Sequence, residues 1–147
     1  MALIIEFFGL VEGVAADARN AYTLVGVNQN VIVSAVLPFS GVRHFVTYGY
    51  DYEGDELAEG SNIEVDFQIV GPSGATVVGQ HNVATAPKKA PDSPKVPGNG
   101  MSLILSVNFL LPDYGEYRAR LALKLLGREV HAERKFWLVA PNAGLDG

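Results

Sequence analysis

The sequence predicts an all-β protein, and two observations support that prediction. Apolar residues alternate with polar ones in three successive segments between residues 101 and 140, and turn residues at 112–115 and 126–127 separate the segments. No segment shows the apolar spacing of an amphipathic helix. About nine strands without a helix are typical of an antiparallel two-sheet sandwich of immunoglobulin-like type, which is the fold we expect.

The first third of the chain predicts three strands. Residues 3–14 are β-branched and aromatic, so we expect one strand there, with a bulge at Gly9 or Gly13. Residues 22–27 and 31–36 flank an Asn-Gln-Asn sequence, and Asn tolerates the positive φ of a tight connection. We therefore expect these two segments to pair with each other as a hairpin.

The middle of the chain predicts three further strands. Residues 42–52 divide by period two into a face with His44, Tyr48, Tyr50 and Tyr52 and an opposite face with Phe45. Strict alternation over residues 63–69 predicts a strand with one face in the core and one in water. A Gly-Pro-Ser-Gly turn at 71–74 then predicts a hairpin with residues 75–84.

The charges of the last two segments fix the register of the final hairpin. A turn at 126–127 places Lys124 opposite Glu129 and Arg120 opposite Glu133 on one face. The same register pairs apolar residues on the other face, namely Leu123 with Val130, Leu121 with Ala132 and Tyr117 with Phe136. A slip of one residue would exchange the faces, so the register is well determined. Arg118 opposite Lys135 is its one unfavourable pair.

Length and proline content define the domain organisation that we expect. The 147 residues fit one domain, over residues 1–140, and residues 141–147 form a flexible tail. Residues 85–100 contain four prolines, at 87, 91, 94 and 97, and almost no apolar side chains. We expect a long, extended Pro-rich loop there, and long loops in compact domains are typically functional or disordered.

Composition limits the classes of partner. The formal net charge is −5, which argues against nucleic acid, and the chain has no cysteine and no stretch of the roughly 20 apolar residues that a membrane helix needs. The apolar amino terminus contains Glu6 and Glu12 and lacks the basic residues of a signal peptide. We expect a soluble, unexported chain, cytoplasmic or, if phage-encoded, in the virion. Hydrophobic residues make up 48% and charged residues only 18%, which favours self-association or a larger assembly with a protein partner.

The candidate metal and catalytic residues have simpler interpretations. Glu129, His131 and Glu133 lie on one strand face and could bind a metal, but pairing of both glutamates with cations explains them better, and we predict no metal site or cofactor. His44 and His81 are isolated, and serines lack a His at any familiar spacing. An acidic cluster at Asp51, Glu53, Asp55, Glu56 and Glu59 could bind a hard cation, but it does not match the EF-hand pattern, so an ordinary solvated loop is the favoured interpretation. We therefore predict that the protein is not an enzyme.

Two groups of residues are candidates for binding. Tyr50 and Tyr52 lie beside the acidic cluster and could contact a sugar, a base or a protein, whereas we expect Tyr48 to pack. Lys88, Lys89 and Lys95 give the Pro-rich loop a positive charge within an acidic chain. The loop either keeps the protein soluble or reaches an acidic neighbour, such as another copy of the chain.

Several stretches together resemble a family of small, uncharacterised immunoglobulin-like β-sandwich proteins of bacteria and their phages. They are LVEGVAADARNAYTLVGV, the Leu37-Pro38 pair, IEVDFQIVGPSG, and SLILSVNFLLPDYGEYRARLAL with the later FWLV. The resemblance covers nearly the whole domain and implies no catalytic residue. Residues 112–117 also resemble the turn and tyrosine that precede a late strand in immunoglobulin-like domains.

These observations favour a noncatalytic binding or assembly module. Such a module could be a subunit of an oligomer or a protein that decorates a phage or another particle. The alternative is a protein that holds a small molecule or glycan in a pocket between the sheets or at an oligomer interface. An enzyme would require His44, His81 or His131 to converge with carboxylates.

Overall fold

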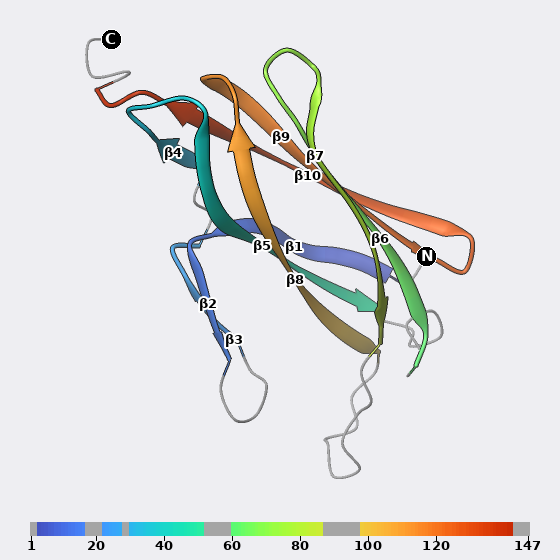
Figure 1. Cartoon of the computed structure of the whole chain (residues 1–147). Helices are drawn as coiled ribbons and strands as arrows, with labels where there is room; N and C mark the ends of the chain where they lie inside the picture. The colour runs from blue at the N-terminus through green and yellow to red at the C-terminus, as the bar shows by residue number, and fades with distance from the viewer. Residues whose placement is uncertain (1–2, 17–21, 28–29, 52–59, 87–97, 143–147) are drawn as a thin grey trace.

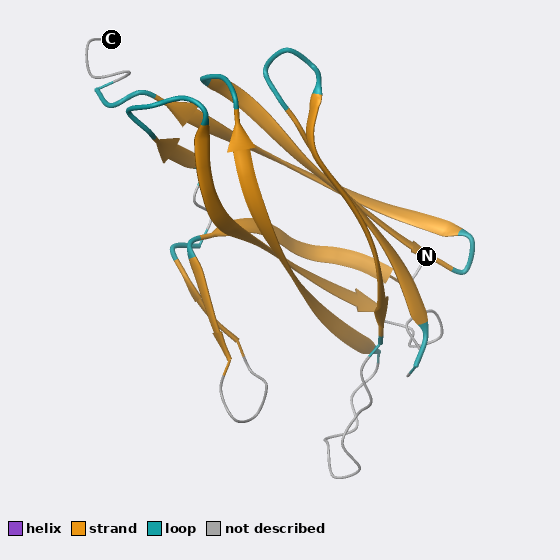
Figure 2. Cartoon of the chain, in the orientation of Figure 1, coloured by secondary structure: helices purple, strands orange, loops and turns teal. Residues whose placement is uncertain are grey.

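The computed structural model describes residues 3–16, 22–27, 30–51, 60–86 and 98–142, and within these ranges it consists of strands, turns and loops without a helix (Figure 2). No helix of the described chain therefore has the length and apolarity to cross a membrane. The strands are β1 (Leu3–Val11), β2 (Gly13–Ala16), β3 (Tyr22–Val25), β4 (Val31–Val33), β5 (Phe39–Asp51), β6 (Asn62–Val70), β7 (Thr76–Thr85), β8 (Asn99–Leu111), β9 (Gly115–Leu125) and β10 (Arg128–Val139).

Two sheets pack against each other and confirm the predicted β-sandwich (Figure 1). One has the strand order β1-β5-β8, and the other has the order β4-β10-β9-β6-β7. Strands β2 and β3 form a separate two-stranded ribbon. Every pairing is antiparallel except that of β4 with β10, which is parallel. The immunoglobulin-like type of the sandwich stays a prediction.

Aromatic side chains fill the space between the two sheets. Phe45 of β5 is fully buried, and its ring centroid lies 4.9 Å from that of Phe67 and 5.6 Å from that of Phe8. Phe136 stacks on Phe109 at 5.7 Å and on Tyr117 at 5.4 Å. Residues from β1, β5, β6, β8, β9 and β10 thus meet in one cluster, which holds the sheets face to face.

The two hairpins that carried the sequence prediction are confirmed. Strands β9 and β10 pair in the predicted register, including Lys124 with Glu129, Arg120 with Glu133 and Arg118 with Lys135. Strands β6 and β7 form the second hairpin, whose turn closes when Gly74 N–H donates to Gly71 O at 3.0 Å. The alternation in β6 also holds, because Ile63, Val65, Phe67 and Ile69 are all buried.

The turn at 112–115 joins strands of different sheets, since β8 belongs to the three-stranded sheet and β9 to the five-stranded one. Tyr117 is fully buried near the start of β9, and its hydroxyl donates to Asp113 O at 2.6 Å and accepts from Asp113 N–H at 3.2 Å. This bond from a tyrosine hydroxyl back to the chain a few residues upstream has the geometry of a tyrosine corner. Burial raises the pKa of Tyr117, which keeps its hydroxyl a donor.

The predictions for the first third of the chain need correction. The expected single strand is two strands that separate at Glu12, and the bulge lies between Ile5 and Phe7 instead of at Gly9 or Gly13. The expected hairpin of residues 22–27 with 31–36 is wrong. Strand β3 pairs with β2, its neighbour along the chain, and β4 adds to the edge of β10, where Trp137 N–H donates to Asn30 O and Ser34 N–H to Val139 O. The pairing of β4 is therefore set by backbone hydrogen bonds with β10, which the residues of the nearby turn do not predict.

The predicted Pro-rich loop overlaps the strands at both ends, because β7 extends to Thr85 and β8 begins at Asn99. Residues 87–97, with Lys88, Lys89 and Lys95, lie outside the described residues, as do Tyr52 and the acidic residues 53–59. The tail that we expect at 143–147 also lies outside them.

Candidate functional site

Strand β8 is a long and uncharged edge strand. It is last in its sheet, and within the described chain β5 is its one ladder partner. All 13 residues of β8 pair with β5 without a register shift, so the strand is regular along its whole length. Its sequence, NGMSLILSVNFLL, contains neither a charged residue nor a proline. Backbone groups on the side away from β5 are therefore arranged in a continuous row that another strand could pair with.

The other edge strands are shorter or obstructed. Strand β1 carries Glu6 and a register shift, and the Arg134 guanidinium donates to Phe8 O at 2.7 Å. Strand β4 has only three residues. Strand β7 has ten residues and carries His81, which is paired with Asp66 on β6. Among these edges, β8 is the longest and the only one of more than four residues without a titratable side chain.

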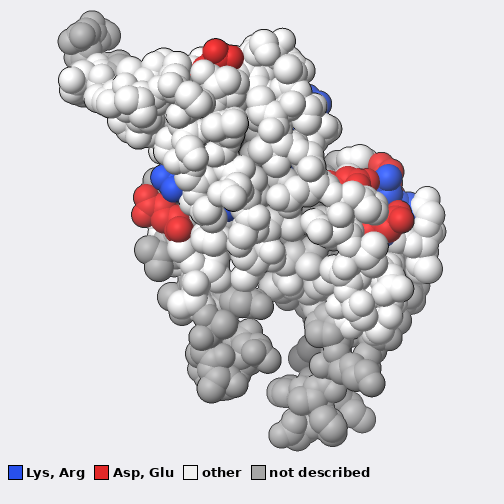
Figure 3. Space-filling model, in the orientation of Figure 1, with Lys and Arg blue, Asp and Glu red and all other residues white. Residues whose placement is uncertain are grey.

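The outward face of β8 carries polar and apolar side chains and no charged one. Five side chains alternate onto this face, and the structure leaves four of them exposed. Leu110 keeps 60% of its surface exposed, and Val42 on the neighbouring strand keeps 49%. In the view of Figure 1, β8 crosses the middle of the molecule, and Figure 3 shows mainly uncharged surface there, with charged side chains at its margins. The outward residues of β8 are Ser102, Ile104, Ser106, Asn108 and Leu110.

Tyr48 and Tyr50 lie on the outer side of β5, next to the start of β8. The predicted division of β5 into two faces is confirmed, since Phe45 and Thr47 are buried on the other face, but Tyr48 is half-buried on the outer side and does not enter the core. The two tyrosine rings are 6.2 Å apart. A Cβ atom on Gly100 would lie 2.4 Å from the Tyr48 hydroxyl and 3.0 Å from the Tyr50 ring, so the absence of a side chain there makes room for both rings. The pKa of Tyr48 is raised, chiefly by partial burial and to a smaller extent by the nearby Tyr50 and Glu6.

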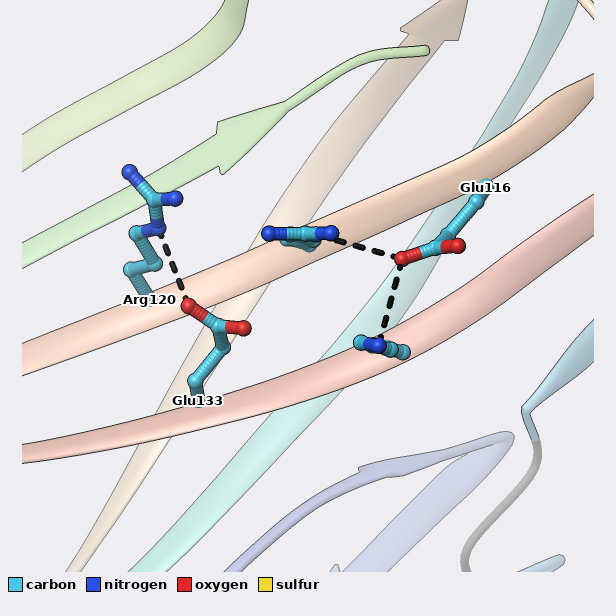
Figure 4. Close-up of polar contacts among 5 residues, drawn as sticks. Glu116, Arg120 and Glu133 are labelled. Carbon is cyan, nitrogen blue, oxygen red and sulfur yellow. Dashed lines mark hydrogen bonds and ion pairs between the residues drawn. The ribbon is translucent and has the colours of Figure 1, made fainter. Parts of the chain in front are cut away.

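The outer face of the five-stranded sheet has the opposite character, because ion pairs cover it. Arg120 Nε lies 3.1 Å from Glu133, and Lys124 Nζ lies 3.4 Å from Glu129, which confirms that both glutamates pair with cations. Glu116 lies 3.1 Å from Arg118 and 3.6 Å from Lys135, so one carboxylate offsets the unfavourable pair (Figure 4). These contacts are solvent-exposed, and each contributes little to stability.

The same face holds two of the three histidines, each in contact with a different carboxylate. His81 Nδ1 bonds Asp66 Oδ1, and Lys124 Nζ lies 3.0 Å from the other oxygen of Asp66. Two hydrogen bonds lower the pKa of Asp66, the larger effect coming from His81 and the smaller from Lys124. Asp66 in turn raises the pKa of Lys124. His131 Nε2 lies 3.1 Å from Glu129. Among the described residues, no three side chains are grouped so that they could hold a metal ion.

The third histidine forms a contact that sequence spacing did not reveal. His44 Nδ1 and Ser106 Oγ are 2.9 Å apart across β5 and β8, although the two residues are 62 positions apart in the chain. Serine and histidine at this distance are two parts of a nucleophilic triad. Among the described residues, no carboxylate is in contact with His44 to orient it, so the pair lacks the third part and is best explained as a cross-strand hydrogen bond.

A pocket opens between the edges of the two sheets, beside β1 and β10. It has a volume of about 410 Å³, and its inner wall is formed by Leu10, Phe45 and Phe136. The Arg134 guanidinium reaches from β10 to Phe8 O on β1. The remaining lining residues are Asn30, Glu133, Lys135 and Trp137. An apolar wall with a few polar groups is the usual composition of a small-molecule site.

Comparisons with known proteins leave function open. No protein-family model matches the chain, and no curated protein is similar to it in sequence. Among solved structures, the chain is similar to the CooA pilin subunit from enterotoxigenic Escherichia coli, with 10% sequence identity and a TM-score of 0.36. The match covers 90% of this chain and 96% of the pilin chain. At that TM-score the likeness carries no argument.

Proposed function

We propose that the protein is a noncatalytic binding and assembly module that joins a protein partner by strand addition at the edge of β8. One observation carries this proposal, which is that β8 is an edge strand of 13 residues without a charge or a proline. Strand addition gives affinity through main-chain hydrogen bonds, so it needs a regular edge more than it needs particular side chains.

The contrast with protected edges supports the proposal. Natural sheets blunt their free edges with lysine, proline, bulges or covering loops, because an open edge pairs with other chains. Strand β1 has a bulge and a bonded arginine, whereas the described part of β8 has none of these devices. An edge without protection is expected where pairing is the function.

Assembly includes the roles expected from the sequence, such as a subunit of an oligomer or a protein that decorates a phage or another particle. A member of the resembled family in a phage genome would act in the virion, and a bacterial member in the cytoplasm. Tyr50 lies on the uncharged side and supports a role in contact. Tyr52, Lys88, Lys89 and Lys95 lie outside the described residues, and their roles in binding stay predictions.

Native mass spectrometry of a charged variant tests the proposal. The double variant Ser102→Lys/Asn108→Lys adds two exposed charges to β8, and Gln68→Lys on the inner strand β6 is a matched control on an exposed position. We expect wild type and Gln68→Lys to form complexes of more than one chain, and the double variant to give single chains. A wild type that stays single at all concentrations, or a double variant that assembles normally, would contradict the proposal.

The pocket beside β10 supports a second candidate function, the binding of a small molecule between the sheets. Its apolar wall and its basic lining residue Arg134, which reaches from β10 to Phe8 O on β1, suit an aromatic anion. The fluorescent probe 8-anilinonaphthalene-1-sulfonate should bind wild type with one-to-one stoichiometry. Binding should weaken in Arg134→Glu and remain unchanged in Arg120→Glu, which makes the same charge change outside this pocket. Equal effects of both variants, or no binding, would count against this candidate.

A further inference from the structure

We infer that the partner of β8 is the β8 strand of a second copy of this chain, in antiparallel orientation about a twofold axis at Leu105. The inference rests on the proposed function and specifies its partner. The pairing would join two three-stranded sheets into one continuous six-stranded sheet, with the strand order β1-β5-β8 in each half.

Charge favours this side of the molecule for contact between copies. Each chain carries a net charge of −5, so two copies repel each other unless they approach where local charge is absent. A twofold pair also brings the side chains near its axis close to their own duplicates, and like charges opposite each other destabilise a sheet. Strand β8 satisfies both conditions because it has no ionisable side chain.

The length of β8 defines the register. Overlap of residues 100–110 with the same residues of the copy places Leu105, their central residue, opposite itself. In an antiparallel ladder, every second residue of β8 points its backbone N–H and C=O groups away from β5. A register centred on one residue pairs these outward groups with each other, so the two edges can form a regular ladder.

The outward side chains are complementary in this register. Ser102 lies opposite Asn108 of the second copy, which places two uncharged hydrogen-bonding groups together. Leu110 lies opposite Gly100 of the second copy, where the side-chain space is occupied by the Tyr48 hydroxyl and flanked by the Tyr50 ring. Pairing would thus bring the most exposed apolar side chain of β8 against two aromatic rings.

Disulfide cross-linking tests both orientation and register, and the chain suits this test because it contains no cysteine. In the inferred pair, Ser102 and Asn108 of opposite copies are direct neighbours, with Cα atoms about 4.5–5.5 Å apart, which lies within the range of a disulfide. Each residue is separated from its own duplicate by six positions along the strands, or about 20 Å, which is too far. Both side chains are exposed, so a cysteine at either position should leave the fold intact.

We expect co-expressed Ser102→Cys and Asn108→Cys chains to form a disulfide-linked dimer under mild oxidation, and either variant alone to form none. Parallel pairing would instead link each variant to itself, and pairing of β8 with a different strand would link neither the mixture nor the single variants. Either result would overturn the inference. If wild type assembles while the mixture fails to link, the inference is wrong but the proposed function survives; if wild type never assembles, the proposed function fails as well.

Discussion

The tyrosine corner provides the most direct test of how the two sheets are joined. Replacing Tyr117 with Phe removes only the hydroxyl, because the ring can keep its stacking on Phe136. The hydroxyl makes two hydrogen bonds with the backbone of Asp113, at 2.6 and 3.2 Å. A net contribution of about 0.5–1.5 kcal/mol for each bond, reduced because water can reach exposed Asp113, gives an expected loss of about 1–2 kcal/mol in the free energy of unfolding.

Urea unfolding monitored by circular dichroism measures this loss. At a typical slope for a small domain, the midpoint should fall by about 0.5–1 M. Tyr114→Phe is the matched control, since its hydroxyl donates to Ser34 O at 2.8 Å from an exposed position where water can substitute. We expect the control to lose no more than about 0.5 kcal/mol. A Tyr117→Phe variant as stable as wild type, or a control that loses more, would refute the reasoning.

Three further predictions concern the core, the charged face and the sheet-switching turn. Phe45→Ala should destabilise the protein by about 3–5 kcal/mol in urea unfolding, because its ring contacts other buried rings on both sheets; a loss below about 2 kcal/mol would contradict the central place of this ring. The pKa of Asp66 is lowered in the folded state. Its contribution to the free energy of unfolding is therefore present above its unfolded pKa and is lost as the pH falls through its folded pKa. The unfolding midpoints of Asp66→Asn and wild type should therefore differ at neutral pH and converge near pH 2; a constant difference would rule out the charge as its cause. Gly115→Ala should lower the melting temperature more than Gly74→Ala does. Both glycines have a positive φ, but only at Gly115 would a Cβ atom lie 2.9 Å from Pro72. Equal losses of melting temperature would show that the proline ring moves aside.

The strands predicted best are those in which two independent constraints agree. In the last hairpin, charge pairs on one face and apolar pairs on the other required the same register, and the structure has it. The resemblance of residues 112–117 to a turn and tyrosine before a late strand drew attention to Tyr117, because a tyrosine corner is a local motif. Local sequence did not show that this turn changes sheets, since its residues specify a reversal and not the partner of the next strand.

Features that depend on long-range pairing could not be read from the sequence. The three residues of β4 find their partner about a hundred positions later, on β10, and hydrogen bonds with backbone groups carry no side-chain signal. The contact of His44 with Ser106 likewise follows from the pairing of β5 with β8. The absence of charge in residues 99–111 was visible in the sequence, but its meaning depends on the edge position of the strand.

Hydrogen exchange at two protein concentrations tests the central claim that β8 is the assembly edge. Outward amides of an unpaired edge exchange rapidly, and a ladder with a second strand protects them. The account predicts that exchange in residues 99–111 slows as protein concentration rises, while exchange in the inner strand β9 stays constant. Exchange in β8 that is independent of concentration, in a sample where mass measurements show assembly, would contradict the claim and place the interface on another surface.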